Sequence, residues 1–323
     1  MHHATAANGK QGVFVAPALL AGPGAKQEAV SQSMEPCYLS GMADESDKLG
    51  RYPKVKVERG LVAYFDILGF THIAADKDIA RAAGLVIESL LEAQKRAEDE
   101  LQPPEAVRRC FTENTRWVVF ADSILILSPV LEQDPQPQVW YEFFVICAAL
   151  LKLMFNAGLP LRGAISEGRF VLIDRCYVGE PIVESIGLAS NTEWSGCVVS
   201  RKAAEKLQTV LSRDERYRSH MQQKSVVYQV PFKVPCAECG KPPRLVIKWF
   251  PFGPYERPAG RTAAIEERVR DRFQAHNKAL SDREAKKLQN TIRFLQYVDT
   301  LYANTNEKRQ IKRHACCSLT RPR

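Results

Sequence analysis

The chain has 323 residues, of which 45% are hydrophobic and 25% charged, and its formal net charge is +8. This is the composition of a globular protein long enough to build a sizeable core, in one large domain or two modest ones. The positive charge is local, because sixteen Lys and Arg but only seven Asp and Glu lie between Arg257 and Arg323. The rest of the chain is close to neutral, so net charge does not identify it as a nucleic-acid-binding domain. We see no apolar run approaching the roughly 20 residues that cross a bilayer, and therefore expect no membrane span.

The nine cysteines are scattered, which is typical of reduced thiols in a cytosolic protein rather than of a small disulfide scaffold. Cys236 and Cys239 form one possible metal clip. A structural zinc takes four ligands and no second pair is present, so we favour a plain β-turn there over a zinc site. The basic C-terminal part is expected to expose a solvated charged face, with RNA or membrane-surface contact as the alternative.

Residues 1–55 are rich in Ala, Gly, Ser and His and are expected to form a disordered leader. Order begins at an apolar strand from Leu61 that carries Asp66, and Gly69 ends it. Thr71 can cap a following helix that extends to about Ala97. After a loop from 101 to 113, residues 117–128 predict two strands that form a hairpin with Asp122 at its tip.

The next elements alternate between helices and strands. They are predicted as an apolar helix at 139–156, a strand at 161–173, a helix at 181–191, a strand at 197–200, a helix at 202–211, two paired strands at 226–232 and 244–250, and one long or two shorter charged helices at 263–303. The order β-α-β-β-α-β predicts an α+β fold with a ferredoxin-like antiparallel sheet and extra C-terminal strands and helices. We divide the chain into the leader, a catalytic domain at 56–255 and a basic helical extension at 256–323.

Asp66 and Asp122 each interrupt an apolar strand, where a carboxylate is costly to bury unless it is paired or binds a metal. The first and third strands of a ferredoxin-like sheet are neighbours, so the two acids are expected to meet at one edge. Without a basic partner they repel each other, and divalent cations resolve that repulsion. Oxygen ligands favour Mg²⁺ or Mn²⁺, in the two-metal arrangement used for phosphoryl transfer. For either acid alone, a turn residue or helix cap is the favoured interpretation, and the metal-binding hypothesis depends on both acids together.

Two glycine-containing stretches add to this hypothesis. Residues 67–71 can form a tight turn into a helix whose first amides cradle a phosphate. Residues 162–168 contain small side chains where a nucleotide or a second subunit could approach the strand, with a β-bulge as the alternative.

Four ordered segments resemble class III adenylate and guanylate cyclases. They are Phe65–Thr71, Phe120–Ile126, Leu161–Gly168 and Tyr177–Ser190, within a match from about 60 to 211. The chain looks most like the pyrimidine cyclases of bacterial Pycsar antiphage defence. That resemblance implies a cytoplasmic homodimer with active sites at the subunit interface and two Mn²⁺ or Mg²⁺ ions per site. It further implies conversion of UTP or CTP to cyclic UMP or cyclic CMP, which activates a separate effector protein, with UTP favoured over CTP.

The resemblance also implies roles for individual residues. Asp66 and Asp122 carry over as metal ligands, with Ile67 offering a backbone carbonyl. The candidate nucleotide-binding residues are Phe65, Gly69, Phe70 and Thr71, and the further candidate catalytic residues are Asn191 and Arg162.

The chain departs from the family in two respects. These cyclases carry an Asn and an Arg one helical turn apart, whereas Asn191 is followed by Trp194 and Ser195. Arg162, Arg169 or a cation from the partner subunit could substitute. The Lys/Asp pair that selects adenine is also not identifiable. The alternatives are an adenylate or guanylate cyclase, an inactive cyclase-like nucleotide-binding module, a polymerase-like or diguanylate-cyclase-like enzyme on the same scaffold, and an RNA-binding protein.

Overall fold

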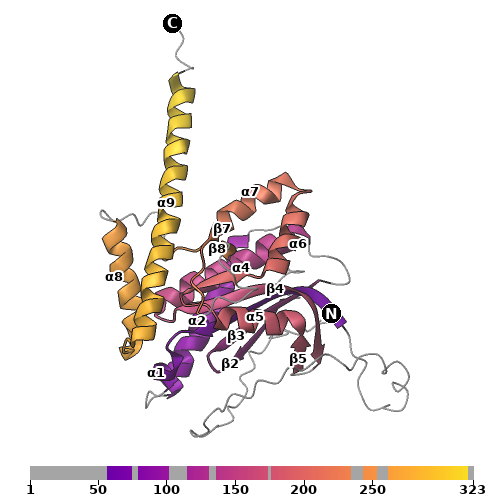
Figure 1. Ribbon diagram of the computed structural model, residues 1–323, viewed down its shortest axis with the longest axis vertical. Helices are drawn as coiled ribbons and strands as arrows, with labels where there is room; N and C mark the ends of the chain where they lie inside the picture. Colours follow the sequence, from indigo (N-terminus) through magenta and orange to yellow (C-terminus); the bar gives the residue numbers. More distant parts are fainter. Residues whose placement is uncertain are drawn as a thin grey trace, which may run out of the picture.

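The computed structural model describes residues 57–74, 79–101, 115–130, 136–173, 176–233, 243–252 and 261–318 (Figure 1). The expected leader at 1–55 and the Cys236/Cys239 turn lie outside these residues. The first half of the fold consists of β1 (Val57–Ile67), α1 (Phe70–Ala74), α2 (Ile79–Leu101), β2 (Arg116–Phe120), β3 (Ser123–Val130), α4 (Pro137–Asn156) and β4 (Leu161–Ile173). The second half consists of β5 (Cys176–Gly179), α5 (Glu180–Ser190), β6 (Gly196–Val199), α6 (Arg201–Leu211), α7 (Glu215–Lys224), β7 (Ser225–Tyr228), β8 (Arg244–Ile247), α8 (Arg261–Gln274), a 3₁₀ turn (Ala275–Asn277) and α9 (Asp282–Ser318).

These strands form one sheet in the order β2-β3-β1-β4-β6-β8-β7, with β5 paired to β4. The first four strands have the ferredoxin-like order, and their antiparallel pairing confirms the predicted α+β fold. β6 lies parallel to β4 and extends the sheet, and the β7–β8 pair completes it, as expected for the extra C-terminal strands.

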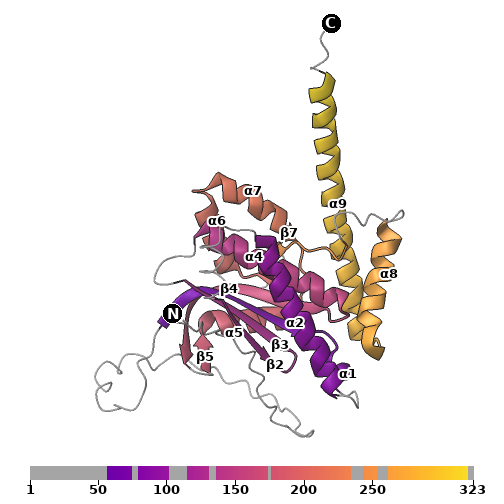
Figure 2. The same cartoon turned by 180° about the vertical axis from the view of Figure 1, so that it is seen from behind.

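The two faces of β1 enter different cores, because successive side chains of a strand point to opposite faces. Leu61, Ala63 and Phe65 are buried in the main core with α2 and α4. Val62 belongs to a smaller cluster with Leu127, Phe170 and Ile182, the last of which comes from α5. Helix α5 therefore lies on the other side of the sheet from α4 (Figures 1 and 2). Asp66, two and four residues beyond Tyr64 and Val62, belongs to the α5 face.

Helix α4 corrects one expectation. Over its 20 residues it is long and apolar enough to cross a membrane, with a mean hydropathy of 1.5 in its apolar window, so the expectation of no such run is wrong. However, 67% of that window is buried inside the protein. Trp140, Phe143 and Phe144 are fully covered, as is usual for a core helix that is hydrophobic on all sides.

The C-terminal helices pack on the sheet-containing core rather than apart from it. Their buried apolar residues join the main core, namely Ile265, Val269 and Phe273 from α8 and Leu288, Ile292, Phe294, Leu295 and Val298 from α9. The Ser195 amide donates to Thr291 Oγ1 (2.8 Å), and Asn290 Nδ2 donates to the Glu193 carbonyl (2.8 Å). The later turns of α9 extend beyond the other elements (Figures 1 and 2).

Several elements differ from the sequence prediction. β5 and α7 were missed, and the helix expected from Thr71 to Ala97 consists of α1 and α2. β5 has four residues, of which Val178 is 66% exposed, so it gives no apolar run to detect. α7 is mostly polar and is held by its cap, in which Asp214 Oδ1 accepts from the Arg216 and Tyr217 amides. The expected long-or-double charged helix is two helices, α8 and α9.

Candidate active site

The strand register brings Asp66 and Asp122 to the same end of the sheet. Asp66, at the end of β1, pairs with Ser123 of β3 on one side and with Arg162 of β4 on the other. Asp122 immediately precedes Ser123, in the two-residue turn of the β2–β3 hairpin. The Ile67 amide donates to the Asp122 carbonyl (2.8 Å), so the end of β1 is bonded to the tip of that hairpin. The two acids, 56 positions apart in the chain, therefore face one another, as the strand order predicted.

Arg162 is a basic partner that the sequence analysis did not anticipate at this point. Its Nε donates to Asp66 Oδ2 at 2.5 Å, and its Nη1 donates to the Ser190 carbonyl at 3.3 Å. The expectation that the two carboxylates meet without a basic partner is therefore wrong for Asp66. The pair is largely shielded, with side-chain exposures of 15% for Arg162 and 12% for Asp66.

Three influences set the pKa of the Asp66 carboxyl, of which two raise it and one lowers it. Burial raises the pKa of its carboxyl, and Arg162 opposes this through its charge and its hydrogen bond. The facing Asp122 raises the pKa of Asp66 further, through its charge and a side-chain hydrogen bond. The net direction is upward, so the ionised form of Asp66 is under-compensated in this arrangement, and an additional positive charge would stabilise it.

Tyr64 and Ser123 belong to the same site. The Tyr64 hydroxyl and Ser123 Oγ lie 2.8 Å apart, and Ser123 Oγ donates to Asp122 Oδ1 at 3.4 Å. Burial raises the pKa of Tyr64, and the charges of Asp66 and Asp122 add to that shift. The sequence did carry a signal for Tyr64, because it lies two residues before Asp66 and so shares its face of the strand.

The space beside the two glycines of β4 is occupied by other side chains of the same chain. A Cβ at Gly163 would lie 2.3 Å from Phe65 Cδ1, and one at Gly168 would lie 3.4 Å from Pro181 Cδ. The idea that a nucleotide or second subunit approaches the strand at these two glycines is therefore wrong. Phe65 is fully buried, so its side chain is not available to a nucleotide.

The turn after β1 has the tight geometry expected of it. Gly69 has φ = 76°, which favours glycine, and the Leu68 amide donates to the Pro160 carbonyl (2.8 Å). Helix α1 begins at Phe70, so Thr71 lies inside its first turn and is not the cap that was expected. Lys278 covers the turn from the C-terminal part of the chain, since a Cβ at Gly69 would lie 2.9 Å from Lys278 Cδ.

Of the remaining candidates, Asn191 lies near the acid pair and Arg169 does not. Asn191 ends α5, directly after the Ser190 carbonyl that Arg162 binds, and its own carbonyl accepts from the Lys233 amide (2.8 Å). Arg169 pairs with Arg59 in the β1–β4 register, seven residues along the strand from Asp66. At about 3.3 Å per residue that is roughly 23 Å, so Arg169 cannot substitute for the missing arginine at the acid pair of its own chain.

The donor set at the acid pair suits a hard divalent cation. Two carboxylates meet beside backbone carbonyls, and such oxygen donors select Mg²⁺ or Mn²⁺. Within the described ranges there is no group of three or more His, Cys, Asp or Glu residues that could hold a metal. Remaining ligands at this site would therefore be backbone, solvent or substrate oxygens, which is how magnesium is commonly bound in phosphate-transferring sites.

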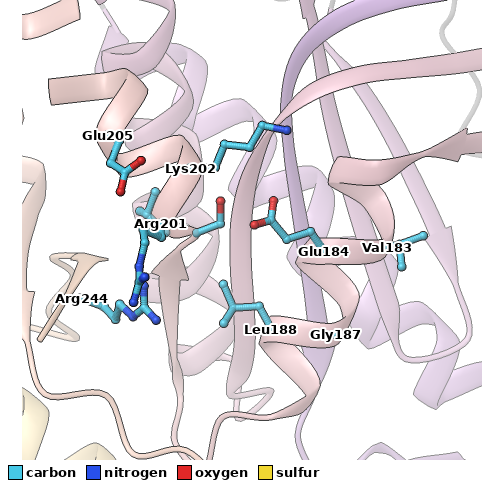
Figure 3. Close-up of a pocket in the computed structure, with 10 residues that line it drawn as sticks. Val183, Glu184, Gly187, Leu188, Arg201, Lys202, Glu205 and Arg244 are labelled. Atoms are coloured by element: carbon cyan, nitrogen blue, oxygen red, sulfur yellow. The ribbon is translucent and has the colours of Figure 1, made fainter. Parts of the chain in front are cut away.

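A separate cavity of about 560 Å³ lies between α5 and α6 (Figure 3). Arg201 and Arg244 lie next to one another on one side of it, and Glu184 lies on the α5 side. Burial lowers the pKa of Arg244, and the neighbouring Arg201 lowers it further. Neither Asp66 nor Asp122 lines this cavity.

Comparison with solved structures finds nucleotide cyclase domains. The adenylyl cyclase CyaB from P. aeruginosa overlaps with a TM-score of 0.41 and 13% identity, over 60% of this chain and 95% of that one. The catalytic core of a rhodopsin-guanylyl cyclase with converted specificity, in complex with ATPalphaS, gives a TM-score of 0.40 and 13% identity over 61% and 98%. A Class III adenylyl cyclase-like ATP-binding protein from Pseudomonas aeruginosa gives 0.36 and 14% over 47% and 35%. No family model matches the chain. A search of curated proteins also finds no match.

Proposed function

We propose that this protein is a metal-dependent nucleotide cyclase, which converts a nucleoside triphosphate to a 3′,5′-cyclic monophosphate and pyrophosphate. The observation that carries the proposal is the meeting of Asp66 and Asp122 at the β2–β3 hairpin. One of these acids has its pKa raised by burial and by the other. Such a pair is unfavourable by itself and becomes favourable when it binds cations beside a triphosphate.

Asp66, Asp122 and the Ile67 carbonyl would hold two Mn²⁺ or Mg²⁺ ions. When bound, the ions would lower the pKa of the ribose 3′-hydroxyl and neutralise the triphosphate and its leaving group. Ser123 Oγ, which is hydrogen-bonded to the Tyr64 hydroxyl, also lies 3.4 Å from Asp122 Oδ1 and would help to orient that carboxylate. We place the triphosphate against the turn formed by Gly69, Phe70 and Thr71.

Arg162 is proposed to exchange partners when substrate binds. Its guanidinium compensates Asp66 in the structure, and with cations on Asp66 it becomes available to phosphate oxygens. Asn191, next to the Ser190 carbonyl that Arg162 also binds, is proposed to position the substrate from the same side. Fixed donors of this kind accelerate phosphoryl transfer through positioning and charge stabilisation.

The base of the substrate, the partner and the pathway come from the resemblance in sequence. We propose UTP or CTP as substrate and cyclic UMP or cyclic CMP as the product, which signals to a separate effector in antiviral defence in the cytoplasm. The proposed homodimer is supported by exposed apolar side chains that a second copy could cover. These are Phe120 (50%), Val178 (66%), Val183 (70%) and Ile186 (39%).

The experiment incubates the purified full chain with Mn²⁺ and each of the four nucleoside triphosphates, and identifies products by mass spectrometry. We expect a cyclic pyrimidine nucleotide from the native chain and none from Asp66→Ala or Asp122→Ala. Asp271→Ala, an exposed site on α8, serves as the matched control and should retain activity. Full activity in either site variant would reject the assignment of the acids. Mn²⁺-dependent binding of a triphosphate without any product would favour an inactive nucleotide-binding module instead.

A further inference from the structure

The first turns of α9 bring basic side chains to the acid pair. Arg283 and Lys287 come from α9, and Lys233 from the segment after β7. With Arg162 they form what we call the basic cluster. Arg162 Nη1 and Lys233 Nζ both donate to the Ser190 carbonyl. The charges of Arg162, Arg283, Glu284 and Asp66 act on Lys287, which lies one helical turn from the Thr291 that bonds to Ser195. Segments far apart in the chain thus converge within electrostatic range of one another.

Among the described residues, three of the four cations in the cluster form no ion pair with a carboxylate. Asp66 is paired with Arg162, and Glu193 is paired with Lys286 outside the cluster. Glu284 accepts hydrogen bonds from Ser281 and lies 3.9 Å from His72. Lys233 donates to the Ser190 carbonyl, which carries no net charge. In the described ranges, the charges of Glu193 and Glu284 act on Lys233 and Lys287 without forming an ion pair with them.

Lys287 is the most informative member of the cluster. It is only 8% exposed, yet in the part of the chain that the structure describes its ammonium has no hydrogen-bond or ion-pair partner. Positive charges held close together on largely buried side chains are costly. Burial and the neighbouring cations accordingly lower the pKa of Lys287, and the same causes lower that of Lys233 to about 8. An anion bound here would remove that cost.

The contacts that fix α9 at this place are specific. Ser195 bonds to Thr291, and the Trp194 ring packs edge-on against Phe294 with centroids 4.6 Å apart. Trp194 and Ser195 are the residues found where an arginine was expected after Asn191. The chain thus uses those positions to anchor a helix that brings in cations of its own.

We propose that Lys287, Arg283 and Lys233 form, with Arg162, a binding site for a linear polyphosphate, so that helix α9 completes the active site. Several cations beside the acid pair match the multiple negative charges of a triphosphate chain or of pyrophosphate. The anion site follows from the side chains themselves. Its assignment to the substrate's triphosphate rests on the proposed function.

The test measures binding of inorganic tripolyphosphate to the full chain by titration calorimetry, without divalent metal. We expect Lys287→Gln to weaken binding by about tenfold or more, as loss of a charge-assisted contact does. Arg201→Gln, in the cavity of Figure 3, is the matched control and should bind as the native chain does. Lys287→Gln should not unfold more easily, because the lysine it replaces is unpaired. Arg283→Gln, at an exposed position, provides a second variant and is also expected to bind more weakly.

Two results would overturn the proposal. One is native affinity for tripolyphosphate in both Lys287→Gln and Arg283→Gln. The other is loss of affinity in Arg201→Gln alone, which would place the anion in the other cavity. The cyclase assay separates this proposal from the proposed function. Tripolyphosphate binding that depends on Lys287 in a protein forming no cyclic nucleotide leaves the anion site standing. Cyclase activity with an unchanged KM in Lys287→Gln removes the assignment of that site to the substrate's triphosphate.

Discussion

Arg162→Met tests how much the Arg162 guanidinium stabilises the ionised Asp66 beside Asp122. The substitution removes the guanidinium and keeps much of the side-chain bulk, so it leaves Asp66 beside Asp122 without its cation. Exposed ion pairs contribute about 0–1 kcal/mol, whereas removing one partner of a buried pair costs about 3–5 kcal/mol. With 15% and 12% of the two side chains exposed, the pair lies toward the buried end of that range. We expect the free energy of unfolding to fall by about 2–4 kcal/mol in metal-free buffer near neutral pH.

The pH dependence of this loss follows from Asp66. Arg162 is the group that lowers the pKa of Asp66 against burial, so the pKa rises further in Arg162→Met. Above that raised pKa the variant carries an uncompensated carboxylate and shows the full loss. As pH falls through it, the carboxyl becomes neutral in the folded state, and the difference from the native chain shrinks.

Urea unfolding in EDTA and in Mn²⁺ measures both effects. Saturating Mn²⁺ should restore about 2–3 kcal/mol to Arg162→Met, since a ligand at a hundred times its Kd stabilises by that amount. In an Asp66→Asn background, Arg162→Met should cost much less, because the charge it neutralises is absent. Equal stability of Arg162→Met and the native chain in EDTA would refute the reasoning.

Three further predictions concern other parts of the fold. Gly163→Ala places a methyl group 2.3 Å from the Phe65 ring, so urea unfolding should show a loss of about 1–3 kcal/mol. The buried ammonium of Lys278 has its pKa lowered to about 8, so its unfolded state binds more protons between about pH 8 and pH 10. The native chain should therefore gain about 2–3 kcal/mol over that range relative to Lys278→Met. Val183→Glu, alone or with Ile186→Glu, should convert a dimer to a monomer in light scattering.

Each of these three predictions would be contradicted by a specific result. Gly187→Ala is the control for the glycine, since nothing lies within 4 Å of its added methyl group, and equal losses in the two variants would contradict the contact. A pH-independent difference between Lys278→Met and the native chain would contradict the buried lysine. An unchanged mass for the glutamate variants would remove the α5 face as the dimer contact.

The sequence predicted the scaffold well because its elements carry strong local signals. The strand at 161–173, the apolar helix ending at Asn156 and the hairpin at Asp122 are all present, with bounds close to those expected. The meeting of Asp66 and Asp122 was predictable because the βαββαβ order alone makes β1 and β3 neighbours.

The interaction partners of individual side chains were harder to predict from the sequence. The pairing of Arg162 with Asp66 depends on the β1–β4 register, which no local pattern specifies. Lys287 and Lys278 were expected on a solvated face, because a basic helix usually exposes its charges. Both are buried. Lys287 lies in the first turns of α9, and Lys278 lies in the connection before α9, where it packs on Gly69 and donates to the Gly158 carbonyl. That packing is a tertiary effect, and net charge gives no indication of it.

The most direct measurement of the central claim is a titration of Mn²⁺ into the full chain, followed by electron paramagnetic resonance of the free ion. The native chain should bind Mn²⁺, more tightly when tripolyphosphate is present. Asp66→Asn and Asp122→Asn should each weaken that binding by about tenfold or more, while Asp271→Asn leaves it unchanged. Native affinity for Mn²⁺ in a folded Asp66→Asn, Asp122→Asn double variant would contradict the claim that these two acids hold the cations.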